Sequence, residues 1–441
     1  MGARVGGRTR WLLAVVCGVS VAAVYAGQPV LGSMGRDLGV PADSVGWFVA
    51  VAQLGYLAGL VVLVPLGDML DRKRLIAAHL ALVAAGMAVT AAAPAAWVAF
   101  AGLAVAGVSA VVVQITVAYA ASISPRAERG RNLGVVTSGV ALGILGARVI
   151  AGGLTQLWGW RSIYVTLAIL AAGLAPLTVV ALPADVRRGA ARYGQVMRSL
   201  GGLFTQRVFL SRGLIAFFLF ASFGTLWSGM ALPLAGAPWH MSAAQIGLFG
   251  IAGLAGALGA ARSGRWGDRG YASRVTGVAL TLLLVSWLAI GRLTWSVPLL
   301  ILGVVALDFA VQAVHVSNQH VLTTAYAERA SATIGGYMVF YSLGSALGAA
   351  ATTALFEAVG WTGSTVLGAV LALCGLTVWA VSDRGRWSGA GTRPYAGRRG
   401  GLGPGGRRPW GPRAGRGRRT HCAGTGTASR SRSTSPRPGP W

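Results

Sequence analysis

Charged side chains are scarce in this chain of 441 residues. They make up 11% of the sequence, whereas apolar residues make up 54%. A soluble globular domain carries about 25% charged residues. The chain has 11 Asp and Glu residues in total, and Lys73 is its single lysine. This shortage of charge excludes an ordinary soluble protein and indicates a chain that places most of its length in lipid.

Cysteines are also few, and the short motifs of several common enzyme classes are absent. The three cysteines are Cys17, Cys374 and Cys422, which predict neither a disulfide framework nor a metal site. The sequence has no His-Glu-x-x-His, Gly-x-Ser-x-Gly or P-loop pattern. We therefore expect no cofactor, no metal and no enzymatic activity.

Long apolar runs are abundant, and each is long enough to cross about 30 Å of hydrocarbon as a helix. They predict an all-α membrane protein with twelve transmembrane helices. The expected spans are 11–33, 46–66, 74–93, 96–121, 133–155, 162–182, 209–235, 243–262, 275–291, 297–320, 333–356 and 363–381.

Basic residues are distributed unevenly between the two sides of these spans. If the N-terminus is cytoplasmic, only Arg36, Arg161 and Arg292 fall in the outer loops. Cytoplasmic loops carry an excess of Lys and Arg. The first apolar run is followed at once by more spans, so it is expected to be an anchor and not a cleaved signal. The sequence thus predicts a multi-pass protein of the cell membrane with both termini in the cytoplasm.

The net charge of +27 does not indicate a nucleic-acid-binding domain. Residues 383–441 contain fourteen arginines and one acidic residue, which account for +13. This tail is rich in Arg, Gly and Pro, and we expect it to be disordered. It is either a tether to the lipid surface or a segment without a role. The lipid bilayer, a small solute and protons are the expected partners, and we expect a functional monomer.

A half-length repeat punctuates the chain. Gly67-Asp68-Met69-Leu70-Asp71-Arg72 recurs as Gly264, three residues, and Asp268-Arg269. Gln114 recurs as Gln312, and Gly159-Trp160 recurs as Gly360-Trp361. Such repeats are typical of transporters built from two similar bundles. We expect two pseudo-symmetric six-helix bundles, 1–182 and 209–382, joined by a cytoplasmic linker, 183–208, which is either a plain connector or includes an interfacial helix.

One predicted helix carries a polar stripe at membrane depth. Asp308, Gln312, His315 and Gln319 fall within an arc of about 60° on a helix. A charged side chain at the bilayer centre costs about 2.5–3.5 kcal/mol even on the lenient insertion scale, so it marks a functional site or a paired structural contact. We expect Asp308 and His315 to exchange protons, and Gln312 and Gln319 to line a cavity. The alternative for each is a hydrogen bond between packed helices.

Other polar residues within the spans are candidates for the same cavity. Arg148 lies in a glycine-rich span, where it either attracts an anionic solute, pairs with Asp308, or extends towards the membrane surface. Tyr25, Gln28 and Gln114 carry phenol and amide groups in otherwise apolar spans. Each is either a cavity residue or a packed polar contact.

The two repeated loops predict a cytoplasmic gate. A carboxylate such as Asp71 just before a helix meets the positive end of that helix. The basic residues that follow Asp71 can form ion pairs with the opposite half of the protein in one conformation and lose them in the other. The expected gate residues are Gly67, Asp68, Asp71, Arg72, Arg74, Gly264, Asp268 and Arg269.

These loops resemble the major facilitator superfamily. The family signature Gly-x-x-x-Asp-Arg-x-Gly-Arg-Arg matches at Gly67, Asp71 and Arg72, although Arg74 replaces the second glycine. The chain is most similar to the bacterial drug- and sugar-efflux-like branch. The residues that carry this likeness are Gln28-Pro29, Gln53-Leu54-Gly55-Tyr56, Gly159-Trp160-Arg161, Leu307-Asp308 and Asn318-Gln319.

The resemblance implies alternating access around a central cavity and the exchange of solute for protons. We expect a proton-coupled exporter of small organic solutes. The alternatives are an uptake symporter and a membrane sensor or scaffold that carries no solute. Only part of the glycine-rich antiporter motif is present, because Ala147-Arg148 stands where the family has a Gly-Pro pair.

Overall fold

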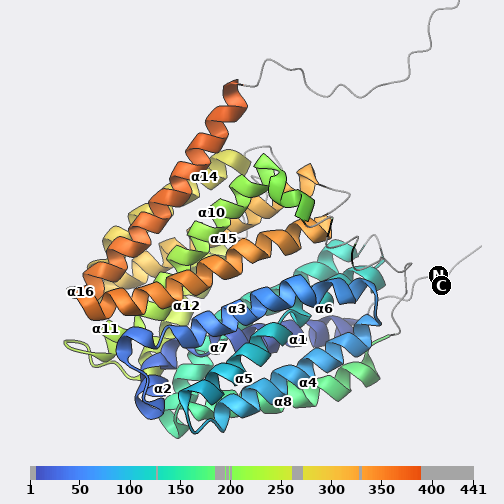
Figure 1. Ribbon diagram of the computed structural model, residues 1–441, viewed down its shortest axis with the longest axis horizontal. Coiled ribbons are helices and arrows are strands. Elements are labelled where there is room, and N and C mark those ends of the chain that lie inside the picture. The colour runs from blue at the N-terminus through green and yellow to red at the C-terminus, as the bar shows by residue number, and fades with distance from the viewer. Residues whose placement is uncertain are drawn as a thin grey trace, which may run out of the picture. The chain divides into compact units, whose positions relative to one another are not determined.

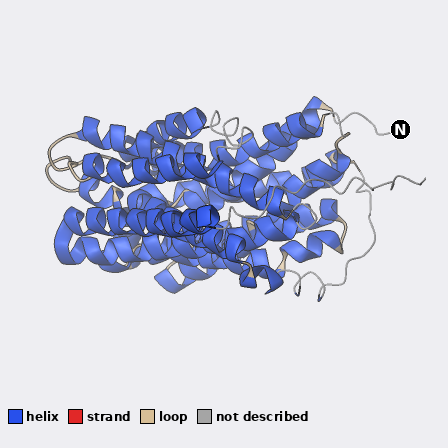
Figure 2. Cartoon of the chain, turned by 90° about the horizontal axis from the view of Figure 1, so that it is seen from above, coloured by secondary structure: helices blue, strands red, loops and turns tan. Residues whose placement is uncertain are grey.

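The computed structural model describes residues 6–125, 128–183, 194, 198, 201–260, 272–326 and 330–388 (Figure 1). Every regular element in these ranges is an α- or 3₁₀-helix, and none is a strand (Figure 2). Helices are the expected outcome in lipid, because a helix satisfies its backbone hydrogen bonds within one segment. The prediction of an all-α protein is confirmed.

The N-terminal half contains the elements from α1 to α8. They are α1 (Gly7–Tyr25), η1 (Gln28–Val30), α2 (Leu31–Leu38), η2 (Ala42–Ser44), α3 (Trp47–Val62), η3 (Val64–Asp68), α4 (Arg72–Ala91), α5 (Ala96–Ser109), α6 (Val112–Ile123), α7 (Arg129–Trp158) and α8 (Arg161–Ala181).

The C-terminal half contains the elements from α10 to α16, preceded by a short 3₁₀ turn. They are η4 (Gly202–Thr205), α10 (Arg207–Gly229), α11 (Ala231–Ala235), α12 (Ala243–Ala260), α14 (Ala272–Ile290), α15 (Val297–Ala325) and α16 (Ala330–Ser388).

The described helices account for twelve membrane crossings. Ten stretches are long and apolar enough to cross a membrane, and Ala243–Gly256 is a shorter apolar helix. One of the ten, Thr333–Asp383, contains two passes, because Gly360 interrupts α16 with φ 68° and ψ −162°. This agrees with the twelve predicted spans. The main difference is in length, since α15 continues to Ala325, past the expected end at residue 320.

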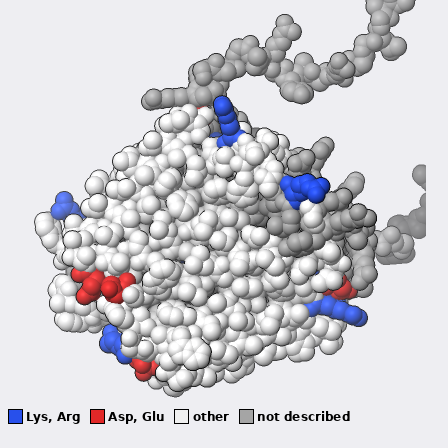
Figure 3. Space-filling model, viewed as in Figure 1, with Lys and Arg blue, Asp and Glu red and all other residues white. Residues whose placement is uncertain are grey.

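The surface is apolar over most of its visible face. In Figure 3 the few charged side chains lie towards the margins and the broad middle is uncharged. Many large apolar side chains of the described residues are exposed, including Val180 at 82% and Leu288 at 73%. Apolar exposure on this scale is unusual for a soluble monomer but matches a surface that faces lipid.

Glycines allow the helices within each half to approach closely. A Cβ atom on Gly139 would lie 2.1 Å from the carbonyl oxygen of Ala14, where α7 crosses α1. A Cβ atom on Gly344 would lie 2.1 Å from the carbonyl oxygen of Phe217, where α16 crosses α10. Small residues at such crossings permit tight packing between helices in a membrane.

The sequence repeat is also a structural repeat. Gly159 and Gly360 both have positive φ, at 78° and 68°, and each separates two consecutive crossings. The indole Nε1 of Trp160 donates to Asp37 Oδ2 at 3.0 Å, and that of Trp361 donates to the carbonyl oxygen of Ile290 at 3.0 Å. The same backbone corner and the same kind of indole anchor therefore recur in both halves.

The halves meet through two equivalent helix pairs, α3 with α16 and α7 with α12. A Cβ on Gly46 would lie 2.1 Å from the carbonyl oxygen of Ala349, and one on Gly152 would lie 2.3 Å from that of Ala243. Thr353 Oγ1 also donates to the carbonyl oxygen of Asp43 at 2.9 Å. These contacts lie away from the side on which α1, α4, α7 and α10 begin, which we call the basic side.

Parts of the expected domain boundaries lie outside the described residues. Within the expected linker, the structure describes 183, 194, 198 and 201–208, including η4. The possible interfacial helix therefore falls largely outside them. At the other end, α16 continues to Ser388, and the rest of the expected tail lies beyond the described part of the chain.

Candidate solute-binding site

Buried polar atoms without hydrogen-bond partners occur on helices of both halves where the halves meet. In the described part of the chain, they include Gln28 Nε2, both amide atoms of Gln53, Arg148 Nη1 and Nη2, Trp227 Nε1, Asp308 Oδ2 and the hydroxyls of Ser342 and Ser345. Buried polar groups are normally hydrogen-bonded, so such a group calls for an explanation. These polar atoms are suited to bind a solute or water.

Arg148 on α7 is the centre of this group. Its side chain is 1% exposed, so it does not extend to the membrane surface, which was one expectation from the sequence. Its Nε donates to Gln28 Oε1 at 2.9 Å. The guanidinium carbon lies 3.7 Å from the centroid of the Trp227 ring, and 5.5 and 5.7 Å from those of Phe223 and Tyr25. These aromatic faces stabilise the cation, each by about 0.5–2 kcal/mol.

Asp308 on α15 lies beside this cation. Its side chain is 2% exposed, and it interacts electrostatically with Arg148. Within the described residues, however, no salt bridge joins the two. A Cβ added to Gly253 on α12 would lie 3.0 Å from Asp308 Oδ2 and 2.8 Å from Trp227 Cζ2. The carboxyl group therefore occupies space that a glycine leaves open.

The remainder of the polar stripe on α15 forms a second cluster. Gln319 Nε2 and His315 Nε2 are 3.0 Å apart, and His315 Nδ1 is 3.0 Å from the Tyr337 hydroxyl. The His315 ring also packs edge-on against Phe220, with 5.3 Å between centroids. Gln312 is partly buried between the two clusters. The stripe thus spans Asp308 at one end and the His315 cluster at the other.

Tyr25 joins the two halves. Its hydroxyl contacts the hydroxyl of Tyr341 on α16, and Gln53 and Ser345 lie close to it. Gln114, another expected cavity residue, donates from Nε2 to the Tyr56 hydroxyl at 3.0 Å. This hydrogen bond lies entirely within the N-terminal half. Gln114 therefore has a structural partner, unlike the side-chain Nη atoms of Arg148.

The expected gate residues are only partly described. Arg72 Nε donates to the carbonyl oxygen of Gly67 at 2.8 Å, and Asp71 Oδ1 accepts from the backbone amide of Arg74 at 3.0 Å. Asp71 is thus the N-cap of α4. The Asp68 side chain and the second-half residues Gly264, Asp268 and Arg269 lie outside the described residues.

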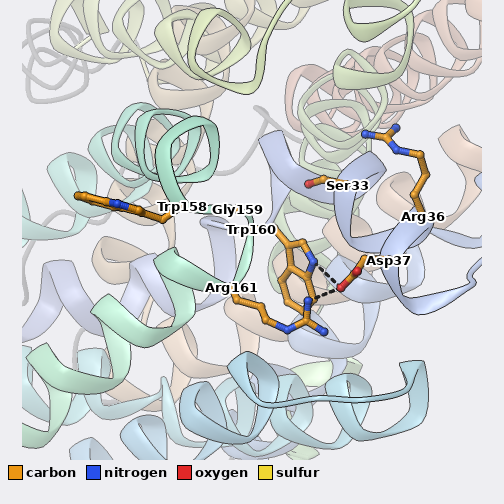
Figure 4. A pocket seen from close by; sticks show the side chains of 7 residues that line it. All are labelled: Ser33, Arg36, Asp37, Trp158, Gly159, Trp160 and Arg161. Carbon is orange, nitrogen blue, oxygen red and sulfur yellow. Dashed lines mark hydrogen bonds and ion pairs between the residues drawn. The ribbon is translucent and has the colours of Figure 1, made fainter.

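A separate surface hollow lies at the first of the two glycine–tryptophan corners (Figure 4). Its volume is about 530 Å³, and it is lined by Ser33, Arg36, Asp37, Trp158, Gly159, Trp160 and Arg161. Figure 4 shows Trp160 and Arg161 both bonded to Asp37. Arg161 also donates to the carbonyl oxygen of Ala93 at 3.0 Å. These groups satisfy one another, so this corner braces α2 against α8.

Sequence analysis missed two aromatic contributors to the site. Trp227 was not among the expected site residues, yet it covers the guanidinium group of Arg148. Tyr341 was not identified, although it meets Tyr25 across the halves. Aromatic residues are common in membrane helices, so type and spacing alone do not separate these two from lipid-facing neighbours. The contact itself was the missing information.

Comparison with known proteins identifies relatives over most of the chain. The profile of the Major Facilitator Superfamily matches residues 11–234 and 213–419. The "Uncharacterized transporter YgaY" of Escherichia coli O157:H7 is 39% identical over 369 residues, covering 83% of this chain and 94% of that protein. The "Probable transporter SCO4007" of Streptomyces coelicolor is 35% identical over 378 residues, covering 84% of this chain and 86% of that protein.

Solved structures show the same fold at low sequence identity. A bacterial homologue of the human lysosomal transporter Spinster, in an inward-facing and unoccupied conformation, has a TM-score of 0.72 and 15% identity. That match covers 86% of this chain and 98% of the other. The nucleoside transporter NupG has a TM-score of 0.67 and 14% identity, with coverage of 85% and 99%.

Proposed function

Because this chain belongs to the major facilitator superfamily and is a membrane transporter, we propose that it exports small organic solutes in exchange for protons. One observation carries this proposal. A buried acid, Asp308, and a buried cation, Arg148, lie together at the meeting of the two halves without a salt bridge between them. Ionisable residues inside a membrane protein usually mark solute paths or proton relays.

Roles for the individual residues follow from their positions. Asp308 exchanges the coupling proton, and His315 relays protons along α15 from the other end of the stripe. Arg148, Gln28, Tyr25, Gln312 and Gln319 line the solute path, whereas Gln114 is the packed polar contact that was its alternative. Asp71, Arg72 and their second-half counterparts form the gate on the basic side.

The contacts between the halves support alternating access. Close approaches at Gly46 and Gly152 hold the halves together on the side away from the basic ends. On the basic side, Cβ atoms added to Gly134 of α7 and Gly335 of α16 would meet nothing within 4 Å. We assign the basic side to the cytoplasm, following the excess of Arg in those loops. On this assignment the close approaches at Gly46 and Gly152 lie on the outer side of the membrane.

Flux in oriented membrane vesicles tests the proposal. A growth screen of cells with and without the protein against toxic organic compounds supplies candidate solutes. Radiolabelled hits are then offered to inverted vesicles that carry the wild-type chain, Asp308→Asn or Glu357→Gln. Glu357 is an exposed acid and provides the matched control. Export predicts accumulation when the vesicle lumen is acidified, with the control active and Asp308→Asn inactive.

Other results would replace the proposal. Accumulation confined to right-side-out vesicles would assign the protein to uptake. A lack of flux for every compound in both orientations would favour a sensor or scaffold. Accumulation in inverted vesicles that does not depend on the proton gradient would support export without proton coupling.

A further inference from the structure

An apolar furrow lies on the surface of the N-terminal half, between α1, α7 and α8. Its volume is about 280 Å³, and Trp11, Ile150 and Leu167 are among the residues that line it. The hydroxyl residues in its lining, Ser138 and Thr166, donate to carbonyl oxygens of their own helices, both at 2.8 Å. The walls of this hollow, which we call the α1–α7 furrow, therefore suit a hydrocarbon ligand.

Glycines on both helices form the floor of the furrow. A Cβ on Gly143 of α7 would lie 2.4 Å from the carbonyl oxygen of Gly18 on α1. One on Gly139 would lie 2.1 Å from that of Ala14. The two backbones are thus in contact and carry no side chains at these glycines. A Cβ on Gly146, which also lines the furrow, would meet nothing within 4 Å, so the space above the floor is open.

The depth of the furrow matches one leaflet of a bilayer. Its lining on α1 runs from Trp11 to Ala22, which corresponds to a rise of about 16 Å along the helix. This is about half the thickness of the hydrocarbon core. Lipid tails are as apolar as the walls, so van der Waals contact, and not transfer from water, favours a chain in the furrow. A gap left unfilled would lose those contacts.

A basic residue lies at the mouth of the furrow. α1 begins on the basic side, and Arg8 lies one turn before Trp11 on the same face of that helix. Arg8 is exposed, whereas Arg10 donates from Nη1 to Asn132 Oδ1 at 3.1 Å. Trp11 is 64% exposed, and indole rings are favoured where lipid meets water. An exposed cation above an apolar furrow is complementary to a lipid with a negatively charged headgroup.

We propose that the α1–α7 furrow binds one acyl chain of an anionic phospholipid from the leaflet on the basic side, with the headgroup at Arg8. All lining residues belong to the N-terminal half, so the lipid stays with that half throughout the transport cycle. The inference goes beyond the proposed function, because it depends neither on the solute nor on proton coupling.

Lipid binding to the purified full-length protein in detergent tests the headgroup contact. Native mass spectrometry compares phosphatidylglycerol, which is anionic, with phosphatidylcholine, which carries the same acyl chains and no net charge. The wild type should prefer phosphatidylglycerol, and Arg8→Gln should reduce that preference by about fivefold, the effect of one basic residue near an anionic lipid. Arg292→Gln removes an exposed arginine between α14 and α15 and should keep the preference.

Gly146→Leu tests the furrow itself. The new side chain would occupy the open space and should weaken the binding of both lipids by about tenfold, because the acyl chain loses its packing contacts. Gly153→Leu is the matched control. It also lies on α7, and a Cβ there also meets nothing within 4 Å, but it does not line the furrow. This control should bind both lipids as the wild type does.

A fluorescence measurement tests the same site without filling it. Phosphatidylglycerol with brominated acyl chains should quench part of the tryptophan fluorescence in a saturable way at low lipid concentration. Trp11→Phe should remove this saturable part. Trp97→Phe removes an indole that is 73% exposed but lies outside the furrow, so the saturable quenching should remain.

Several outcomes would overturn the inference. They are equal affinity for the two lipids, an unchanged preference in Arg8→Gln, equal binding by monodisperse Gly146→Leu and Gly153→Leu proteins, or saturable quenching that survives Trp11→Phe. Stronger binding of a free fatty acid than of phosphatidylglycerol would assign the furrow to another ligand and also overturn it. The proposed function fails separately, because the flux test of Asp308→Asn involves no residue of the furrow.

Discussion

The two halves use the same helix crossing for different purposes. In the N-terminal half, α3 lies against α5, and a Cβ on Gly59 would lie 2.2 Å from the carbonyl oxygen of Val108. In the C-terminal half, α12 lies against α15, and a Cβ on Gly256 would lie 2.4 Å from that of Val305. Both pairs are 197 residues apart in sequence, the offset of the repeated Gly-x-x-x-Asp-Arg loop. The backbone frame is therefore shared.

The side chains within this frame differ. Tyr56 of the first half corresponds to Gly253 of the second, and Val111 corresponds to Asp308. In the first half, the Tyr56 phenol fills the space and is bonded to Gln114. In the second half, the glycine leaves the space to the Asp308 carboxyl. We call the first copy the filled crossing, because it is occupied and internally bonded, and the second copy the open crossing, because it leaves space for an ionisable carboxyl group.

This comparison separates stabilising from functional polar residues. A polar group that has found a partner in its own half lowers the energy of the fold. A buried polar group without one raises that energy, because it has lost its hydration without replacement. We propose that it is retained in the open crossing because a solute or a proton completes it during transport.

The largest expected effect is that of Asp308→Asn on gradient-driven flux. The amide keeps the shape of the carboxyl group but cannot take up and release the coupling proton. Flux driven by a pH gradient should fall to the level of vesicles without the protein. Exchange of labelled for unlabelled solute, measured at equal pH on both sides, should persist. Undiminished pumping by this variant would show that the open crossing is not the proton site.

Gly253→Ala should have the next largest effect. The added methyl group would lie 2.8 Å from Trp227 Cζ2, 3.0 Å from Asp308 Oδ2 and 3.1 Å from Leu145 Cδ2, so the ring and the carboxyl group must move. Displacements on this scale near a reactive group reduce rates by about tenfold or more. Solute flux in proteoliposomes measures the effect.

The control for that substitution is Gly173→Ala on α8, where an added Cβ meets nothing within 4 Å. Expression and flux should both stay at the wild-type level in this control. Equal losses in the two variants would mean that any extra methyl group in a helix impairs transport. The effect of Gly253→Ala would then be no evidence for a functional site at the open crossing.

Much of this frame could be predicted from the sequence. Twelve apolar runs and the recurring Gly-x-x-x-Asp-Arg loops were sufficient for the twelve helices and the two-half organisation, because lipid restricts the backbone so strongly. The polar stripe from Asp308 to Gln319 was also apparent, because it depends only on helical spacing. These are properties of single helices or of simple repetition.

The composition of the site could not be predicted in the same way. The contact of Arg148 with Trp227 and Gln28 joins α7 to α10 and η1, three segments far apart in the chain. Sequence spacing gives no information on such pairs. Gln114 illustrates the converse, since it looks like a cavity residue in sequence but donates to Tyr56 in the folded chain. Which polar groups are left unbonded depends on tertiary packing alone.

The glycine corners should behave alike in the two halves, with a smaller effect. Gly159 has φ 78° and ψ 168°, and Gly360 has φ 68° and ψ −162°. This region is almost exclusive to glycine, so Gly159→Ala and Gly360→Ala should each destabilise the protein by about 1–3 kcal/mol. Thermal unfolding in detergent measures the loss. A loss for one variant and none for the other would mean that the corners are not structural equivalents.

Tyr56→Phe should have the smallest effect and the most specific one. It removes the hydroxyl that accepts from Gln114 and leaves the ring in place, so the free energy of unfolding should fall by about 1 kcal/mol. Flux should remain near the wild-type value, because the hydrogen bond that is lost neither carries the coupling proton nor contacts the solute. A variant of normal stability that has lost its flux would place Tyr56 in the transport path. Both crossings would then take part in transport, although their side chains differ.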